Sequence, residues 1–268
     1  MYSRILVPID GSTFSEQLAA PAARLAKATG AGLALLRVVD KAEEHEAASR
    51  YVDDLAALLG AQAICTLAPA AGIAAAICEE ARRVPSTLVA ICSHGRSGAM
   101  RAIFGSVALE VLRGLDEPLV VFRPDTEHAA TPSRVGRIVL PLDGSATSES
   151  IAPQAATLAK WLGAKIVVVS VIDPSLNIDQ VVAAGDVRES NYVHAQARQI
   201  ADRHGIDVGW EVLHGDPKTA IPQFVRSLGD AMLAMTTHGR TGFSSVISGS
   251  VMAQCLRDAG VPVFTRLP

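Results

Sequence analysis

Short apolar runs alternate with longer amphipathic stretches along the whole chain. The runs are rich in Val, Ile, Leu and Ala and lack polar alternation, which is typical of strands buried on both faces of a sheet. The stretches between them carry apolar residues at helical spacing. We therefore expect ten strands, at residues 5–9, 33–39, 63–67, 87–92 and 119–122 in the first half and at 138–142, 165–172, 208–213, 231–236 and 262–265 in the second.

Strands that alternate with helices predict a parallel sheet covered by helices on both faces. The first amphipathic stretch follows Ser12 and stops at Gly30, a residue that commonly ends a helix. Thr13 and Glu16 have the spacing of a capping box at its start. Pro21 conflicts with a straight helix, so we expect either a kink there or a later start.

The chain is an internal repeat, and the repeat decides its architecture. RILVPIDGS at residues 4–12 recurs as RIVLPLDGS at 137–145, and HGRSG at 94–98 recurs as HGRTG at 238–242. The offset between the copies grows from 133 to 144 residues, so the second copy has about eleven extra residues in its middle. A polar, Pro-containing segment joins the copies. We predict two domains of one fold, at residues 1–127 and 134–268.

Composition excludes several classes of protein. The chain has 268 residues, of which 49% are hydrophobic and 19% charged, with a net charge of −3. That charge gives no reason to expect binding to nucleic acid or to an anionic membrane. The four cysteines lack metal-ligand spacing, and the first residues lack the apolar h-region of a signal peptide. No apolar run reaches the roughly 20 residues of a membrane helix. We expect a cytoplasmic protein.

Two polar, Gly-rich loops follow strands in each half, at residues 10–12 and 94–98 and at 143–145 and 238–242. In open α/β sheets, ligands bind at the carboxyl ends of the strands, where the strand order reverses. If the first and fourth strands are neighbours, both loops of a half open into one crevice. An Asp there can accept hydrogen bonds from ribose hydroxyls or an exocyclic amine, and a Gly-rich loop lets backbone N–H groups approach phosphate. The alternative is that these glycines only form turns.

The two halves resemble the universal stress protein family, whose nucleotide motif is G-x2-G-x9-G-[ST]. The chain has Cys92-x2-Gly95-x9-Gly105-Ser106 and Thr236-x2-Gly239-x9-Gly249-Ser250, together with the family's PxDGS loop after the first strand. The resemblance implies an α/β fold of two Rossmann-like domains, similar to adenine nucleotide alpha hydrolases, each with a five-stranded parallel sheet of order 3-2-1-4-5 and helices on both faces. It also implies binding of ATP, with or without Mg2+, and no dedicated catalytic residues or metal ligands.

The resemblance assigns a role to each matching position. The Pro and Asp of the first loop would flank the adenosine, the Val backbone of the second strand would meet the adenine, and the Gly-rich loop with the following helix would hold phosphate and ribose. In the first half these residues are Pro8, Asp10, Val38, Gly95, Arg96, Gly98, Gly105, Ser106 and Val107. In the second half they are Pro141, Asp143, Val171, Gly239, Arg240, Gly242, Gly249, Ser250 and Val251.

The resemblance further implies that the two halves pair through their last strands as an intramolecular pseudo-dimer. Pairing with a second copy of the chain stays open.

The chain departs from the family pattern in two ways. Cys92 and Thr236 replace the first motif glycine, and a side chain there would crowd a ligand. The first half also lacks a match to Gly215-Asp216-Pro217, so we expect the second half to be the better site.

Three functions fit these features. The favoured hypothesis is an ATP-binding regulatory module, in which His94 and His238 only make local hydrogen bonds. The second is a binding scaffold whose nucleotide sites have degenerated, with dimerisation as its role. The third is an enzyme that cleaves the α–β bond of ATP, although the chain lacks a P-loop and an acceptor-substrate domain.

Overall fold

The computed structural model describes residues 1–93, 104–123, 134–173, 182–238 and 250–268. These residues form two compact units, Met1–Ala129 and Ala130–Pro268. The predicted junction between the domains lies outside the described residues, so the predicted bounds 1–127 and 134–268 stay a prediction.

The first unit has five strands and four α-helices in its described part. The strands are β1 (Arg4–Pro8), β2 (Gly32–Val39), β3 (Gln62–Leu67), β4 (Thr87–Cys92) and β5 (Leu119–Phe122). The helices are α1 (Thr13–Thr29), α2 (His45–Leu59), α3 (Ile73–Arg83) and α4 (Ser106–Gly114), and the short 3-10 turn η1 (Ala42–Glu44) precedes α2.

The second unit repeats this series in its described part. Its strands are β6 (Arg137–Pro141), β7 (Lys165–Ile172), β8 (Val208–His214), β9 (Ala231–Thr236) and β10 (Val263–Arg266). Its helices are α5 (Ala146–Glu149), α6 (Ala152–Leu162), α7 (Val182–His204), α8 (Pro217–Leu228) and α9 (Ser250–Asp258). The extra residues of this half lengthen its second long helix, since α7 has 23 residues and its counterpart α2 has 15.

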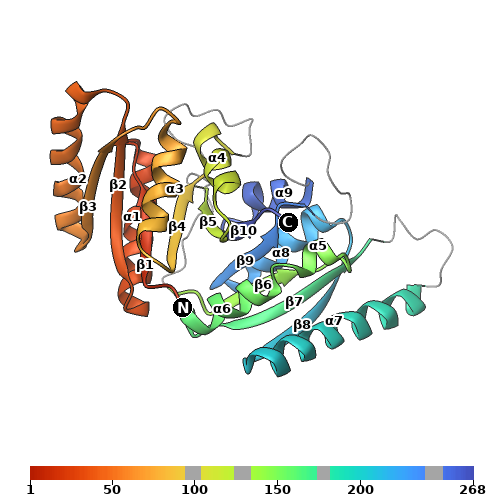
Figure 1. Cartoon of the computed structure of the whole chain (residues 1–268). Coiled ribbons are helices and arrows are strands. Elements are labelled where there is room, and N and C mark those ends of the chain that lie inside the picture. Colours follow the sequence, from red (N-terminus) through yellow and green to blue (C-terminus); the bar gives the residue numbers. More distant parts are fainter. Residues whose placement is uncertain (94–103, 124–133, 174–181, 239–249) are drawn as a thin grey trace. The chain divides into compact units, whose positions relative to one another are not determined.

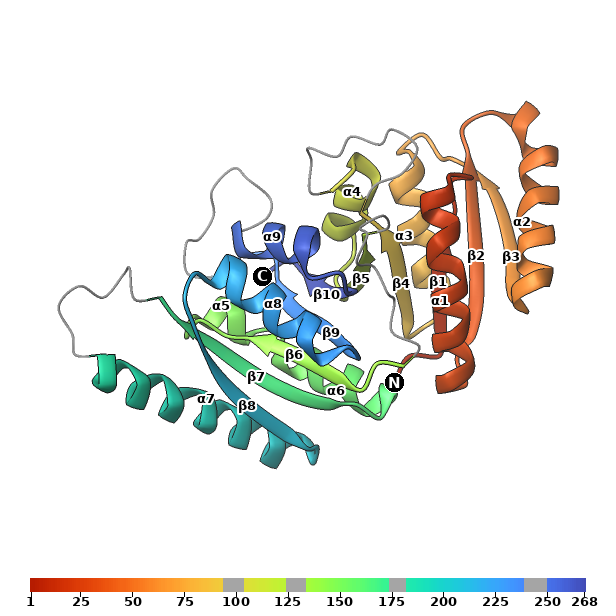
Figure 2. The ribbon, with the colours of Figure 1, turned by 180° about the vertical axis from the view of Figure 1, so that it is seen from behind.

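Strand order confirms the predicted fold class. The order is β3-β2-β1-β4-β5 in the first unit and β8-β7-β6-β9-β10 in the second, which is 3-2-1-4-5 in both. The pairings between described strands are parallel. In the first unit, α1 and α2 cover one face of the sheet and α3 and α4 the other (Figures 1 and 2).

The strands are buried because both faces of each sheet are covered. Ile5, Leu6, Leu35 and Leu36 of β1 and β2 are at most 1% exposed. The edge strand β8 is the contrast, since Trp210 on it is 43% exposed. Buried central strands with no polar alternation are what the apolar runs predicted.

The start of α1 differs from the prediction. Ser12, not Thr13, is the N-cap residue, and its side chain accepts a hydrogen bond from the Ser15 backbone N–H. Gly11, at a φ of 80°, turns the chain so that Ser12 takes this place. Glu16 therefore forms no capping box with Thr13 and instead accepts a hydrogen bond from Tyr51.

The two proline positions show how the copies diverge. Pro21 lies inside α1, which runs unbroken from residue 13 to 29. In the second unit, Pro153 lies in the first turn of α6, and the corresponding helix is divided into α5 and α6. The first turn tolerates proline because its N–H groups have no partner within the helix. None of the helices in the described part is both long and apolar enough to cross a membrane.

Candidate functional site

The strand order reverses between β1 and β4 in the first unit and between β6 and β9 in the second. β1 and β4 are parallel neighbours, with Leu6 opposite Val89, and β6 and β9 are neighbours with Val139 opposite Leu233. The condition set by the sequence is met, because the carboxyl ends of these parallel neighbours lie at the same edge of each sheet. This edge at the reversal point is where ligands bind in open α/β sheets.

The Asp-Gly-Ser turn after the first strand has the same construction in both units. Asp10 Oδ1 accepts hydrogen bonds from the Ser12 backbone N–H at 2.9 Å and from Ser12 Oγ at 2.6 Å. Asp143 Oδ1 accepts the same pair from Ser145, at 3.0 and 2.6 Å. Each serine then caps the helix that follows. One carboxylate oxygen of each aspartate therefore fixes the turn, which gives these residues a structural role alongside the predicted ligand role.

The second strand extends past the end of the first, beside this turn. The ladder between β1 and β2 ends with the Ile9 N–H donating to the Leu36 carbonyl at 2.8 Å. In a parallel ladder, alternate residues direct their backbone groups to the same neighbour, so Val38 faces the space beyond β1. In the second unit the last such bond joins Leu142 N–H to the Val169 carbonyl, and Val171 has the matching place. Pro8 and Pro141 end their strands beside these positions.

The helix α4 begins at the end of β4. Gly105 is its N-cap residue, and the Gly105 N–H donates to the Ser93 carbonyl at 2.6 Å. The first bond within the helix runs from the Leu109 N–H to the Gly105 carbonyl. The N–H groups of residues 106–108 thus have no partner within the helix, and no side chain caps this end in the described part. A helix N-terminus of this kind attracts anions.

Cys92 joins these parts of the first unit. Its Sγ lies 3.0 Å from the Phe14 carbonyl in the first turn of α1, and its side chain is 8% exposed. Burial, and to a smaller extent the Asp10 carboxylate, raise the pKa of the Cys92 thiol to about 12. The thiol is therefore protonated at neutral pH and unsuited to act as a nucleophile.

At the matching position of the second unit, Thr236 Oγ1 donates to the His238 carbonyl at 2.7 Å, and Thr237 Oγ1 lies 2.9 Å from His238 Nδ1. His238 therefore has local hydrogen-bond partners, and its predicted restriction to a local role stays a prediction. His94 lies outside the described residues.

The structure places part of the predicted site. The Asp10 turn, the ends of β1 and β4 and the start of α4 come together in the first unit, and Val107 lies in the first turn of α4. Val251 lies in the first turn of α9, which begins at Ser250. The remaining predicted residues, Gly95, Arg96, Gly98, Gly239, Arg240, Gly242 and Gly249, lie outside the described residues and stay predictions.

Sequence reasoning missed a polar cluster beside each Asp turn. Tyr51 donates to Glu16 Oε1 at 2.5 Å, and Tyr192 donates to Glu149 Oε1 at 2.7 Å. Burial and then the glutamate raise the pKa of each tyrosine, while a hydrogen bond from the Gly144 backbone to Tyr192 lowers its pKa in part. The one available signal was Arg37, a charged residue inside the apolar run of β2.

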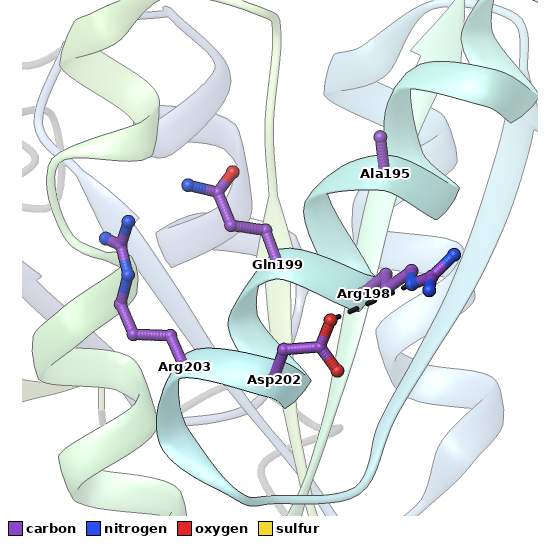
Figure 3. A pocket seen from close by; sticks show the side chains of 5 residues that line it. All are labelled: Ala195, Arg198, Gln199, Asp202 and Arg203. Atoms are coloured by element: carbon purple, nitrogen blue, oxygen red, sulfur yellow. Dashed lines mark ion pairs between the residues drawn. The ribbon is translucent and has the colours of Figure 1, made fainter.

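A separate depression lies along α7 (Figure 3). It is lined by Ala195, Arg198, Gln199, Asp202 and Arg203. These residues are exposed and belong to one helix, and an ion pair of 3.7 Å joins Arg198 to Asp202. No predicted site residue takes part, so this depression is not the candidate site. In the described ranges, no three His, Cys, Asp or Glu side chains are grouped to hold a metal ion.

Comparison with known proteins agrees with the fold. Residues 1–73, 70–123 and 134–265 match the model of the Universal stress protein family. The chain is 26% identical over 135 residues to universal stress protein MJ0531 of Methanocaldococcus jannaschii, which covers 48% of the chain and 79% of that protein. A Mycolicibacterium smegmatis universal stress protein is 26% identical over 190 residues, covering 68% of the chain and 62% of that protein.

Among solved structures, a universal stress protein from Archaeoglobus fulgidus is similar over 100% of this chain and 99% of its own length. The TM-score is 0.67 and the sequence identity 19%, a level at which the likeness concerns the fold alone.

Proposed function

Because the chain belongs to the universal stress protein family, we propose that each unit binds an adenine nucleotide, ATP in the first place, and that the bound nucleotide regulates the protein. The site is the edge of the sheet at the strand reversal, where the Asp turn faces the adenosine and the helix that follows the Gly-rich loop faces the phosphates. The residues that would hold the ligand are those assigned from the family resemblance.

One observation carries the proposal. In the first unit, the Asp10 turn, the end of β4 and the helix start at Gly105 are joined by short contacts at one edge of the sheet. An acidic turn and N–H groups without a partner in their helix offer complementary chemistry to a ribose or amine and to a phosphate. Mg2+ would be brought by the nucleotide, since the described residues contain no metal-binding group of their own.

The proposal involves regulation rather than turnover. The family resemblance implies no dedicated catalytic residues, and the buried Cys92 thiol is held in its protonated form. Slow hydrolysis of ATP would be measured by release of phosphate in a long incubation. Pairing of the two halves through their last strands, and pairing of two chains, stay predictions.

The second candidate function is a scaffold with degenerate sites. The side chains of Cys92 and Thr236, where the motif has glycine, favour this alternative. Under it, the purified protein would release no nucleotide on denaturation, and ATP would not raise its melting temperature.

A negative charge introduced at the start of α4 should affect nucleotide binding and protein stability in opposite directions. Ser106 is exposed at the first position of this helix. In Ser106→Asp, the new carboxylate should stabilise the helix N-terminus, by about 0.3–1 kcal/mol, while it repels phosphate. We expect the first unit to lose ATP affinity by roughly tenfold or more, as measured by calorimetric titration, with an unchanged or higher melting temperature.

Ser106→Asn is the matched control, because the asparagine side chain is similar in size to aspartate and has no charge. It should bind ATP within about threefold of the parent. Equal affinities of the Asp and Asn variants for ATP would contradict placement of the phosphates at this helix.

A further inference from the structure

The two candidate sites differ in charge at one matched position beside the Asp turn. Leu36 of β2 lies opposite Pro8, and Val169 of β7 lies opposite Pro141. The next residue along each strand is Arg37 in the first unit and Ser170 in the second, and both are buried. The ladders thus show that Arg37 and Ser170 hold the same place in the repeat.

A tyrosine–glutamate pair lies beside this place in both units. Tyr51 on α2 donates to Glu16 on α1, and Tyr192 on α7 donates to Glu149 on α5. Gln196 Nε2 adds a second hydrogen bond to Glu149 at 3.2 Å. The paired tyrosines provide a common reference for counting along the second helix of each unit.

The matched residues differ in their own charge and in the group that they contact. Arg37 reaches the turn itself, since its NH1 donates to the Ile9 carbonyl, next to Asp10, at 3.3 Å. Ser170 Oγ instead donates to Glu189 Oε2 at 3.1 Å. Glu189 lies three residues before Tyr192, and the residue three before Tyr51 is the buried Ala48. The cluster of the first unit therefore combines two carboxylates, Asp10 and Glu16, with a guanidinium, whereas the second has a third carboxylate and a neutral hydroxyl.

We infer that the two sites differ in ligand charge: the first favours highly charged adenine nucleotides such as ATP, and the second favours adenine compounds of low charge. This inference rests on the proposed function and sharpens it. The groups involved are buried or half-buried, and a buried charge acts on a nearby ligand with less screening than an exposed one. The first unit has a guanidinium where the second has a hydroxyl, and the second has a carboxylate where the first has Ala48, so the local charge differs by two units. The preference for ATP over adenosine should therefore differ between the units by roughly tenfold or more.

The test uses the full chain with one site disabled at a time. Ser250→Asp disables the second site, so that binding reports on the first. Ser106→Asp disables the first site, so that binding reports on the second. Calorimetric titrations with adenosine, AMP and ATP, at low salt and with EDTA present, give the ratio of the adenosine Kd to the ATP Kd for each site. We expect the ratio to be at least about tenfold larger for the first site, and the difference to shrink at 0.5 M salt.

Three substitutions at two residues assign the difference to Arg37 and Glu189. Arg37→Met removes the charge and keeps the length of the side chain, so the ratio of the first site should fall, whereas Arg37→Lys should keep most of it. Glu189→Gln, which is nearly isosteric, should raise the ratio of the second site. The Glu189 result stands even if Arg37→Met fails to fold.

Equal ratios at the two sites would overturn the inference and leave the proposed function intact. An equal fall in Arg37→Met and Arg37→Lys would also overturn it, because the arginine would then act by holding the turn and not by its charge. If neither adenosine nor ATP binds to the parent chain, the proposed function fails and the inference fails with it.

Discussion

The carboxyl end of the first strand has similar contacts in the two units, whereas its amino end has different ones. At the carboxyl end, the Asp-Gly-Ser turns share two serine-to-aspartate hydrogen bonds of nearly equal length. At the amino end, Arg4 forms a buried ion pair with Glu80 at 2.8 Å, whereas Arg137 forms a half-exposed one with Asp230 at 3.2 Å. All the atoms of the turn come from three consecutive residues, but the partner of each arginine comes from a distant helix or loop. The repeated motif therefore keeps the hydrogen bonds between its own residues, whereas its contacts with residues elsewhere in the chain differ between the copies.

The largest expected effect lies at the amino end. Glu80 accepts from Arg4 and Arg83, and Arg4 also donates to the Glu80 carbonyl and to Thr87. Glu80→Ala should lower the free energy of unfolding of the first unit by about 3–5 kcal/mol, because a buried guanidinium loses its counter-charge. Asp230→Ala in the second unit should cost about 0–1 kcal/mol. Urea unfolding of both variants at neutral pH measures the two losses, and similar losses would break the comparison.

The carboxyl ends should respond alike and more weakly. Ser12→Ala and Ser145→Ala each remove a helix cap and the hydroxyl's hydrogen bond to the aspartate two residues before, and they keep the backbone N–H bond. We expect a loss of about 1 kcal/mol in each unit, as for other N-cap serines. The same unfolding experiment checks this, and losses that differ by much more than the fitting error would show that the turns are not equivalent.

The smallest effect concerns the pH dependence of stability and the last residue of each fourth strand. Burial raises the pKa of Cys92 from 9.0 to about 12 in the folded state. Since the folded pKa lies above the unfolded one, the contribution to stability is complete below pH 9 and is lost as the pH rises towards 12. Cys92→Thr, which copies Thr236, should therefore make the alkaline loss of stability shallower, by under about 1 kcal/mol at pH 9.5.

Unfolding curves at pH 8.0 and pH 9.5 provide this comparison. Thr236→Ser serves as the control in the second unit, where no thiol occupies the position. If Cys92→Thr leaves the pH dependence unchanged, the thiol already ionises in the folded protein.

Local patterns in the sequence predicted the strands and the parallel α/β class, and the family resemblance implied the strand order. Long-range contacts limited what the sequence predicted of the site. The apolar runs located all the described strands, because buried parallel strands have no polar alternation. The position of the N-cap at Ser12 was missed because it depends on the positive φ of Gly11. The clusters at Arg37 and Glu189 were missed because they join residues from strands and helices that the motif does not contain. The predicted role of the Gly-rich loops stays a prediction, because these loops lie largely outside the described residues.

Counting bound nucleotides tests the central claim most directly. Native mass spectrometry of the full chain, titrated with ATP and Mg2+, should show up to two nucleotides per chain. Ser106→Asp and Ser250→Asp should each remove one, and the double variant should bind none while it keeps its circular dichroism spectrum. A double variant that still binds as many nucleotides as the parent would contradict the assignment of the sites to the carboxyl ends of the two sheets.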